Sequence, residues 1–222
     1  MTAEFKALAG PNPIGRWGEN WTVPAGEWAG ETAFILGGGP SLKTTDLSRL
    51  PTIGPTIAIK HALRLAPWAE CLLWADARWL EWDAQAKADV LAHDAIWKVT
   101  TQGPPLELVG HVQFIVWARR YFRTEALSKD PSVLGGYASG DVALNLAYLL
   151  GARRIILLGF DMQGGHWHEG KAESGDGSRQ HMIAVIEAMA PILAAEGRQV
   201  INATPGSALQ CFPVMSLDEA LA

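Results

Sequence analysis

Short apolar runs alternate along this chain with longer segments whose apolar residues recur at helical spacing. Most runs are strand-sized, rich in Ile, Leu, Val and Trp, and followed by glycine, proline or polar residues. Such runs are typical of buried parallel strands, and the segments between them are typical of connecting helices. The predicted strands span residues 32–37, 56–60, 71–75, 95–100, 111–116, 154–159 and 200–202.

Helical spacing and helix-ending residues predict the connecting elements. The predicted helices span residues 42–50, 78–91, 142–150, 180–196 and 217–221, with a helical turn at 62–68 and loops at 124–137 and 162–179. We therefore expect an α/β, Rossmann-like, doubly wound fold, which is a mainly parallel sheet with helices on both faces.

The length of 222 residues suits a single domain of this class. Residues 1–30 are rich in Pro, Gly and Trp, and we expect them to form an irregular N-terminal arm. Residues 31–222 would then form a single Rossmann-like nucleotide-binding domain.

The composition narrows the class of protein. Charged residues make up 18% of the chain and hydrophobic residues 49%, which excludes a mainly disordered chain. The net charge of −5 argues against broad non-specific nucleic-acid binding, although Arg119, Arg120 and Arg123 form a basic patch that keeps a local contact open. Cys71 and Cys211 belong to no C-x-x-C pair, which indicates reduced cysteines. No apolar run approaches the ~20 residues of a membrane span, so we expect a cytoplasmic protein without a membrane partner.

The stretch of residues 32–43 organises the predicted fold. An apolar strand leads into a turn made of Gly37, Gly38, Gly39, Pro40 and Ser41. Glycines let a ligand approach the backbone, and free N–H groups at a helix start attract an anion. The pattern is neither G-x-G-x-x-G nor a P-loop. Two interpretations of the turn therefore stay open: a phosphate site of no specific class, or a purely structural turn.

Polar residues follow several predicted strands, at the edge where open parallel sheets bind ligands. Lys60 ends one predicted strand, and Asp76 and Arg78 follow the next. Asn202 and Ser207 lie near the last strand and are candidates for contact with a nucleotide base or phosphate, although Thr-Pro-Gly-Ser is also an ordinary turn.

The loop after Asp161 carries His166 and His168, separated by one residue. Three interpretations compete: a metal site, a general base, or a pair of surface histidines. A metal would need a third ligand, for which Asp161, Glu169 or His181 are available, whereas a base needs only one neutral imidazole near an acceptor hydroxyl. No zinc signature such as H-E-x-x-H is present, and we expect no metal site. Asp161 itself either braces the loop or orients a ligand hydroxyl or a histidine.

Two blocks of the sequence resemble one known superfamily. They are Gly37-Gly-Gly-Pro-Ser-Leu-Lys43, running on to Asp46-Leu-Ser-Arg-Leu-Pro51, and Ala138-Ser-Gly-Asp141 with Ile155-Ile-Leu-Leu-Gly-Phe-Asp161. Both are similar to the Rossmann-like bacterial CMP-sialic acid-dependent lipooligosaccharide sialyltransferases. Asn202-Ala-Thr-Pro-Gly-Ser207 is similar to the late Pro-x-Ser element of those enzymes. The two blocks also resemble a related family of uncharacterised proteins, which includes archaeal 6-hydroxymethylpterin pyrophosphokinases and short phage and prophage proteins.

The resemblance implies a nucleotide held by the turn at residues 37–41. It also implies donor or nucleotide contacts from Ser139, Gly140, Pro205, Gly206 and Ser207. The sialyltransferases use a loop histidine as general base, and His166, His168 and His181 are the candidates here.

The chain departs from the sialyltransferase pattern in three places. Gly38 stands where that family has an asparagine in the glycine loop, and Lys60 stands where an asparagine follows the second strand. The paired tyrosines beyond the Ser-Gly element are not evident. Lys60 favours a more anionic donor than CMP-sialic acid, such as a nucleoside diphosphate sugar.

Three functions follow from these observations. The leading hypothesis is a nucleotide-dependent transferase, and most specifically a glycosyltransferase whose donor is a CMP- or nucleoside-diphosphate-linked sugar and whose base is a loop histidine. Lys60 or Arg78 would stabilise the leaving phosphate. The first alternative is an ATP- and Mg²⁺-dependent pyrophosphokinase-like enzyme with Asp76 or Asp161 near the metal, and the second is a non-enzymatic phage or prophage nucleotide-binding module. A glycan and a nucleic acid both remain open as acceptor. The sequence is compatible with Mg²⁺ but does not require it, and it is compatible with a homo-oligomer.

Overall fold

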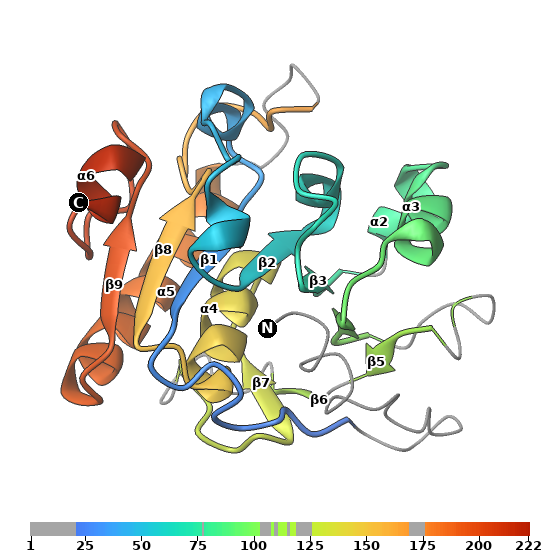
Figure 1. The fold of residues 1–222 in the computed structure, drawn as a ribbon, viewed down its shortest axis with the longest axis horizontal. Helices are drawn as coiled ribbons and strands as arrows, with labels where there is room; N and C mark the ends of the chain where they lie inside the picture. The colour runs from blue at the N-terminus through green and yellow to red at the C-terminus, as the bar shows by residue number, and fades with distance from the viewer. Residues whose placement is uncertain are drawn as a thin grey trace.

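A seven-stranded sheet forms the centre of the protein (Figure 1). The structure is a computed structural model, and it describes residues 21–76, 78–102, 108, 111–114, 116–118, 126–168 and 176–222. The strands lie in the order β5-β4-β3-β2-β1-β8-β9, and every neighbouring pair is parallel. Their bounds are β1 (Thr32–Leu36), β2 (Thr56–Ile59), β3 (Cys71–Trp74), β4 (Trp97–Thr100), β5 (Gln113–Phe114), β8 (Arg154–Leu158) and β9 (Gln199–Asn202).

Helices cover both faces of this sheet, and each face has its own cluster of buried side chains. On one face the cluster includes residues of α4 (Ser139–Leu150) and α5 (Asp176–Ala195). On the other it includes residues of α2 (Trp79–Trp82), α3 (Ala86–Ala92) and α6 (Leu217–Leu221). The predicted doubly wound α/β fold is confirmed.

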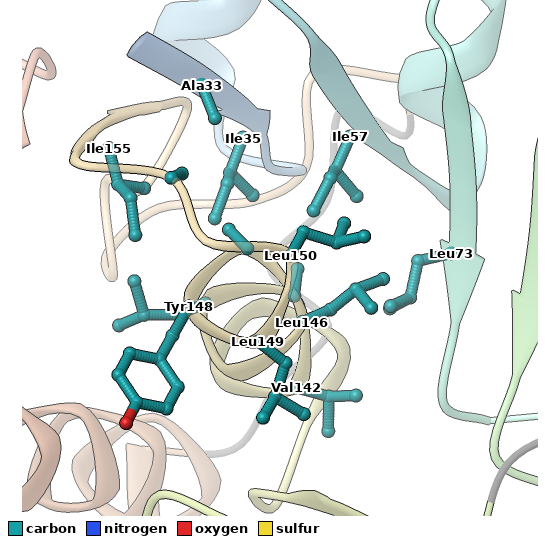
Figure 2. Close-up of a cluster of buried hydrophobic side chains, with 14 of the residues drawn as sticks. Ala33, Ile35, Ile57, Leu73, Val142, Leu146, Tyr148, Leu149, Leu150 and Ile155 are labelled. Atoms are coloured by element: carbon teal, nitrogen blue, oxygen red, sulfur yellow. The ribbon is translucent and has the colours of Figure 1, made fainter. Parts of the chain in front are cut away.

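Strand β1 shows why the central strands are apolar at nearly every position. Ala33 and Ile35 belong to the cluster on the α4 face, while Phe34 and Leu36 belong to the cluster on the opposite face. Side chains alternate between the faces of a strand, so a strand covered on both sides needs apolar residues throughout. Figure 2 shows Leu146 and Leu150 of α4 on the side of the sheet toward which Ile35 and Ile57 point.

Two short 3-10 turns replace the helix that was predicted at residues 42–50. They span Pro40–Thr44 and Leu50–Thr52. The hydroxyl of Thr45 donates to the carbonyl of Ser41 at 3.0 Å. Side-chain bonds of this kind compete with helical backbone bonds, and the prediction of a continuous helix was wrong here.

The helix that was predicted at residues 78–91 is interrupted. Helix α2 ends at Trp82 and α3 begins at Ala86. Between them the backbone of Asp83 is extended, and its Oδ1 accepts from the N–H of Gln85 at 2.9 Å. An aspartate that bonds the backbone two residues ahead favours a turn, and this turn brings Asp83 to the pocket described below.

Two further predictions differ from the structure. They are the strand at residues 111–116 and the loop at residues 124–137. Strand β5 is followed by a separate strand, β6 (Val116–Ala118). β6 pairs with β7 (Val133–Gly135) in a two-stranded parallel sheet. Three-residue strands carry too few positions for a period-of-two pattern to be detected in the sequence.

Residues 21–30 contain turns and neither helix nor strand. Trp21 and Trp28 are buried there, with ring centroids 6.3 and 5.9 Å from that of Trp97. Residues 1–20 of the predicted arm lie outside the described residues. The division of the chain at residue 31 therefore stays a prediction.

Three further predictions concern single residues or segments. The basic patch of Arg119, Arg120 and Arg123 lies outside the described residues. Cys71 and Cys211 are both free thiols. Across the part of the chain that the structure describes, no helix is both long and apolar enough to span a bilayer.

Asn145 provides a test of how β7 is attached to the fold. This fully buried side chain accepts from the N–H groups of Ser128 and Gly135, at 3.0 and 2.6 Å, and donates to the carbonyl of Ser128 at 2.8 Å. Asn145→Leu leaves these backbone groups without partners, and we expect the free energy of unfolding to fall by about 3 kcal/mol. Urea denaturation measures this loss, with Gln199→Ala on an exposed position as the control. Equal stabilities of the two variants would contradict the assignment.

Candidate functional site

A pocket of about 300 Å³ opens at the carboxyl ends of neighbouring strands. Its wall combines the glycine turn after β1, the residues after β2, helix α2, the start of α4, the loop after β8, and two residues of α5. The chain crosses from one half of the sheet to the other between β1 and β8, and such switch points are where open parallel sheets bind ligands.

The backbone of the glycine turn is bonded to the end of β8. The N–H of Gly37 donates to the carbonyl of Leu158 at 2.7 Å, and the N–H of Gly39 donates to that of Gly159 at 2.8 Å. These two N–H groups are therefore used inside the protein. The predicted helix start after the turn is wrong, because a five-residue 3-10 turn takes its place. Gly37, Gly38 and Gly39 line the pocket, and their contact with a phosphate stays a prediction.

Asp161 braces this turn from behind. Its carboxylate accepts from the N–H and the hydroxyl of Ser41, at 3.2 and 2.8 Å, and its side chain is buried. The backbone carbonyl of Asp161 accepts from Ala208 at 2.9 Å. Of the two interpretations of this residue, the observed contacts support the brace.

Two glycines of the turn are required by close contacts. A Cβ atom at Gly39 would lie 1.9 Å from Oδ2 of Asp161, and a Cβ at Gly38 would lie 2.8 Å from Nδ1 of His166. Both distances are far below van der Waals contact. The absence of side chains at Gly38 and Gly39 therefore allows the loop after β8 to pack closely against the turn.

A second helix start at the pocket is that of α4, which is longer than the 3-10 turn after the glycine turn. Ser139 and Gly140 line the wall, and the hydroxyl of Ser139 accepts from the N–H of Ala75 at 3.0 Å. The first N–H groups of a helix have no acceptor within the helix and carry partial positive charge. This 12-residue helix can therefore supply the anion-binding geometry that was expected after the glycine turn.

Two cations line the same pocket, Lys60 after β2 and Arg179 on α5. Arg179 also donates to the carbonyl of Gly164 in the loop after β8. Lys60 and Met162 have positive φ angles of 50° and 54°, and both line the pocket. Non-glycine residues adopt this conformation at a cost, and such strain clusters at functional sites.

The two loop histidines are both in the pocket wall, where a third imidazole joins them. Nδ1 of His166 lies 3.2 Å from the carbonyl oxygen of Gly38. The ring of His168 stacks between those of His166 and His61, with centroid separations of 5.4 and 3.7 Å. The loop after β8 therefore reaches across the pocket to the end of β2.

Asp76, Arg78 and His181 lie outside the pocket wall. The guanidinium of Arg78 binds the carboxylate of Asp76 at 2.8 Å. Burial alone would raise the pKa of Asp76, but the hydrogen bonds from Arg78 outweigh it and lower that pKa. His181 lies on α5 instead of on the loop, is exposed, and packs on the ring of Tyr137 at 4.5 Å.

The end of β9 and the residues after it contact the loop after β8. Asn202 is buried and donates to the carbonyl of Leu209 at 3.1 Å, and the hydroxyl of Ser207 donates to the carbonyl of Phe160 at 2.6 Å. The exposed Gly206 accepts from the pocket residue Gln163, and the adjacent Pro205 is also exposed. The observed contacts of these residues hold the turn in place.

Sequence reasoning missed several residues of the pocket. Met162, Arg179 and Met182 line it, and Asp83 contacts Nε2 of His61 at 2.8 Å. The position directly after β2 was a signal for His61, whereas nothing in the sequence indicates that the first turns of α5 face this edge of the sheet.

The metal interpretation has no support in the described residues, where no group of three or more His, Cys, Asp or Glu side chains is arranged to hold a metal ion. His166 and His168 stack face to face, with an interplanar angle of 13°, and do not converge on a common point. Glu169, one of the suggested ligands, lies outside the described residues.

Comparison with solved structures identifies the fold. The chain is similar to the monofunctional α-2,3-sialyltransferase Cst-I of Campylobacter jejuni, with a TM-score of 0.54 and 15% identity over 88% of this chain and 83% of that chain. For the Campylobacter jejuni sialyltransferase CstII with cytidine-5′-monophosphate, the TM-score is 0.51 and the identity 16% over 85% and 86% of the two chains. For CST-II with a trisaccharide acceptor and CMP, the values are 0.50 and 14% over 84% and 86%. No family model and no curated protein matches the sequence. The resemblance to the sialyltransferase superfamily is thus confirmed at the level of the fold.

Asp141, in the first turn of α4, provides a pH-dependent test of this site. Burial raises its pKa to about 7, although the N–H groups of Ala138 and Val142 donate to Oδ1 at 2.7 and 2.8 Å. The folded protein therefore holds one more proton than the unfolded chain between about pH 4 and pH 7, and this group makes stability fall as pH rises through that window. Asp141→Asn should flatten the fall and raise the melting temperature at pH 8 by a few degrees.

Melting temperatures measured from pH 4 to pH 8 check this expectation. Asp130→Asn is the matched control, because hydrogen bonds from Ser132 hold the pKa of that exposed carboxyl below its usual value, outside the window. Identical pH slopes for the wild type and Asp141→Asn would show that Asp141 stays ionised throughout.

Proposed function

We propose that this protein is a glycosyltransferase that uses a nucleotide sugar, with a CMP-linked sugar as donor. The observation that carries the proposal is the convergence of a helix N-terminus, two cations and an oriented imidazole in one pocket at the switch point of a sialyltransferase-like fold. The structures of CstII and CST-II named above contain CMP, and one of them contains a trisaccharide acceptor. The acceptor proposed here is accordingly a glycan.

The donor phosphate would bind at the start of α4. Ser139 and Gly140 present the helix N-terminus to the pocket, and Lys60 and Arg179 add positive charge. These groups would stabilise the charge that develops on the departing phosphate. Lys60 lines the pocket and Arg78 does not, so Lys60 is the stronger of the two candidates for this role.

The proposed general base is His166. A carbonyl oxygen only accepts hydrogen bonds, so the contact with Gly38 places the proton of the neutral ring on Nδ1. Nε2 then keeps its lone pair. His168 supports this ring by stacking on it, and His181 is not proposed as the base because it lies outside the pocket wall.

The proposed reaction transfers the sugar in one step. Nε2 of His166 takes the proton of the acceptor hydroxyl, whose oxygen forms the new bond to the anomeric carbon. The bond from that carbon to the phosphate oxygen breaks, and its electron pair stays on the phosphate. General-base catalysis of this kind contributes about 10²–10⁴-fold to the rate.

Nucleotide binding tests the proposal directly. We expect CMP to raise the melting temperature without Mg²⁺, since a ligand at a hundred times its dissociation constant stabilises the folded state by about 2.7 kcal/mol. UDP, GDP, ADP and ATP are the comparison ligands, each with and without Mg²⁺. A rise in melting temperature only with a nucleoside diphosphate would replace the CMP-linked donor by a nucleoside-diphosphate sugar. A rise only with ATP and Mg²⁺ would favour the pyrophosphokinase alternative, and no rise with any nucleotide would favour the non-enzymatic module.

His166 and Gly38 should act as one unit. We expect His166→Gln to lower the release of CMP from CMP-sialic acid by about 10²–10⁴-fold while CMP binding persists. Gly38→Ala should lower it as well, because the new Cβ would lie 2.8 Å from Nδ1 of His166 and displace the ring. His181→Gln, outside the pocket wall, is the matched control. Full turnover in His166→Gln would remove this residue from the mechanism.

A further inference from the structure

One end of the pocket is formed by residues that the proposed donor site does not use. His61, after β2, and Trp79 and Trp82, on α2, line the wall on the side of β2 and β3. Most of the donor groups described above lie at the ends of β1 and β8 and at the start of α4, and Lys60 directly precedes His61 after β2. The two ends of the pocket therefore differ in the chemistry that they offer.

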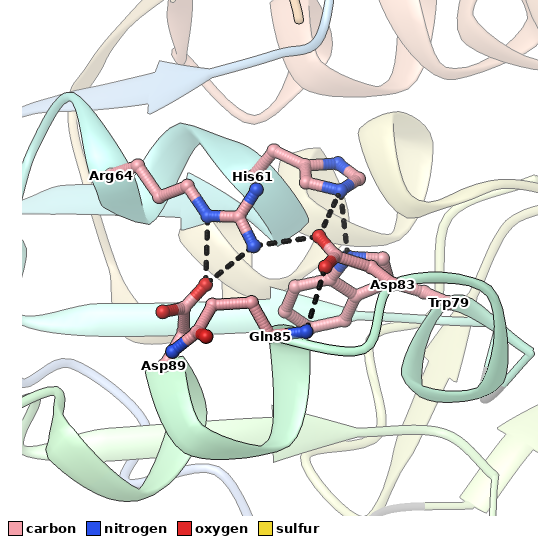
Figure 3. Close-up of polar contacts among 6 residues, drawn as sticks. All are labelled: His61, Arg64, Trp79, Asp83, Gln85 and Asp89. Carbon is pink, nitrogen blue, oxygen red and sulfur yellow. Dashed lines mark hydrogen bonds and ion pairs between the residues drawn. The ribbon is translucent and has the colours of Figure 1, made fainter. Parts of the chain in front are cut away.

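The ring of His61 is held in one orientation (Figure 3). Its Nε2 lies 2.8 Å from Oδ2 of Asp83 and 3.2 Å from the indole nitrogen of Trp79. The ring packs on that of His168, with centroids 3.7 Å apart and an interplanar angle of 35°, and forms a T-shaped contact with Trp79, with centroids 5.6 Å apart. The ring is therefore fixed by contacts with α2, with the turn after it, and with the loop after β8.

The carboxylate of Asp83 is itself anchored. Its Oδ2 accepts from Nη2 of Arg64 at 2.6 Å, and its Oδ1 accepts from the N–H of Gln85 at 2.9 Å. Arg64 also binds Asp89, with Nε donating at 2.7 Å. Figure 3 shows this arginine between the two carboxylates, so its charge is neutralised on both sides.

Two contacts of Nε2 make opposite demands on the tautomer of His61. The carboxylate of Asp83, 2.8 Å away, only accepts, whereas the indole N–H of Trp79, 3.2 Å away, only donates. The contact with the charged carboxylate is the shorter and the stronger, so we assign the proton of the neutral ring to Nε2 and the lone pair to Nδ1. Burial lowers the pKa of His61, and the hydrogen bond with Asp83 only partly opposes this. The charged groups that act on the ring are Asp83, Arg64 and Lys60. At neutral pH Nδ1 is thus a hydrogen-bond acceptor without charge.

Trp82 gives the same end of the pocket an open aromatic surface. It is 66% exposed, and it is the most exposed of the large hydrophobic side chains among the described residues. The other exposed ones, Ile53 and Leu91, are not part of the pocket wall. The guanidinium of Arg78 lies 4.9 Å from the centroid of the Trp82 ring. An aromatic ring of this kind binds apolar faces of other rings while it tolerates water around it.

We propose that His61, Asp83 and Trp82 form a subsite for an uncharged, hydroxyl-bearing ring, which is the acceptor sugar of the proposed transfer. Trp82 would stack on the sugar ring, and Nδ1 of His61 would accept from one of its hydroxyls. Asp83 acts through His61 as a positioning residue. The identification of the bound sugar as the acceptor rests on the proposed function. The preference for a neutral ring rests only on the chemistry of the subsite.

The distribution of charge supports this division of the pocket. An anion at the subsite would lie near the carboxylate of Asp83, which is only partly neutralised because Arg64 divides its single positive charge between Asp83 and Asp89. The donor phosphate would instead meet Arg179, Lys60 and the N-terminus of α4. The phosphate of the donor and the neutral acceptor therefore have separate places.

Saturation-transfer NMR with named sugars tests the subsite. The probes are lactose, glucose and glucuronate, the last two differing by a carboxylate, each measured with and without CMP. We expect lactose and glucose to bind the wild-type protein and glucuronate to bind more weakly. Trp82→Ala should weaken sugar binding by about tenfold, the loss that corresponds to one stacking contact, and Trp82→Phe should retain most of it. Leu91→Ala is the matched control, since it truncates an exposed apolar side chain outside the pocket wall.

The tautomer of His61 provides a second readout that does not depend on catalysis. Nitrogen-15 NMR at pH 7 should show His61 neutral with its proton on Nε2, and Asp83→Asn should weaken that preference and sugar binding together. Arg64 keeps its contact with Asp89 in this variant, so the fold should persist.

The outcomes separate the two proposals. Sugar binding that is absent in the wild type, or equal in Trp82→Ala and wild type, would overturn the subsite, as would a His61 ring protonated on Nδ1. Failure of CMP to stabilise the protein would instead overturn the proposed donor. Sugar binding that depends on Trp82 in a protein that ignores CMP would retain a neutral-sugar site and discard the transferase.

Discussion

The contact between the glycine turn after β1 and the loop after β8 holds the site together. The two strands are neighbours in the sheet, so the segments that follow them begin side by side. The carboxylate of Asp161 then binds the N–H and hydroxyl of Ser41, and the carbonyl of Gly38 contacts Nδ1 of His166. A side chain at Gly38 or Gly39 would push the loop away. The glycines serve this close approach, and the position of the histidines in the pocket depends on it.

The departures from the sialyltransferase pattern acquire a structural meaning in this pocket. At Gly38 a side chain is missing where the imidazole of His166 approaches the backbone. Lys60 takes a left-handed backbone conformation in the pocket wall, between the glycine turn and His61. Neither change disturbs the fold, whose likeness to the sialyltransferases extends over most of both chains. The fold therefore tolerates changes in residues of the pocket wall, as is common for folds that host different functions.

The pocket separates positive charge from a neutral polar surface. The start of α4 and Arg179 offer charge and N–H groups around β1 and β8, while His61 and Trp82 offer a lone pair and an aromatic face on the side of β2. His168 joins the two sides, because its ring contacts those of His61 and His166. A transferase must hold an anionic donor and a hydroxyl-bearing acceptor next to each other, and the two proposals assign them to these two sides of the pocket.

The sequence by itself determined where the main strands lie along the chain, the glycine turn after the first of them and the histidine loop after β8. These features depend on local patterns, since a strand covered on both faces is apolar at nearly every position, as in residues 155–158. The tertiary structure alone decided which side chains meet. Asp83 interrupts a predicted helix to reach His61, and Arg179 enters the pocket from a helix far along the chain. Contacts across 20 to more than 100 residues depend on how elements pack, and the period of a single segment carries no information about its partner.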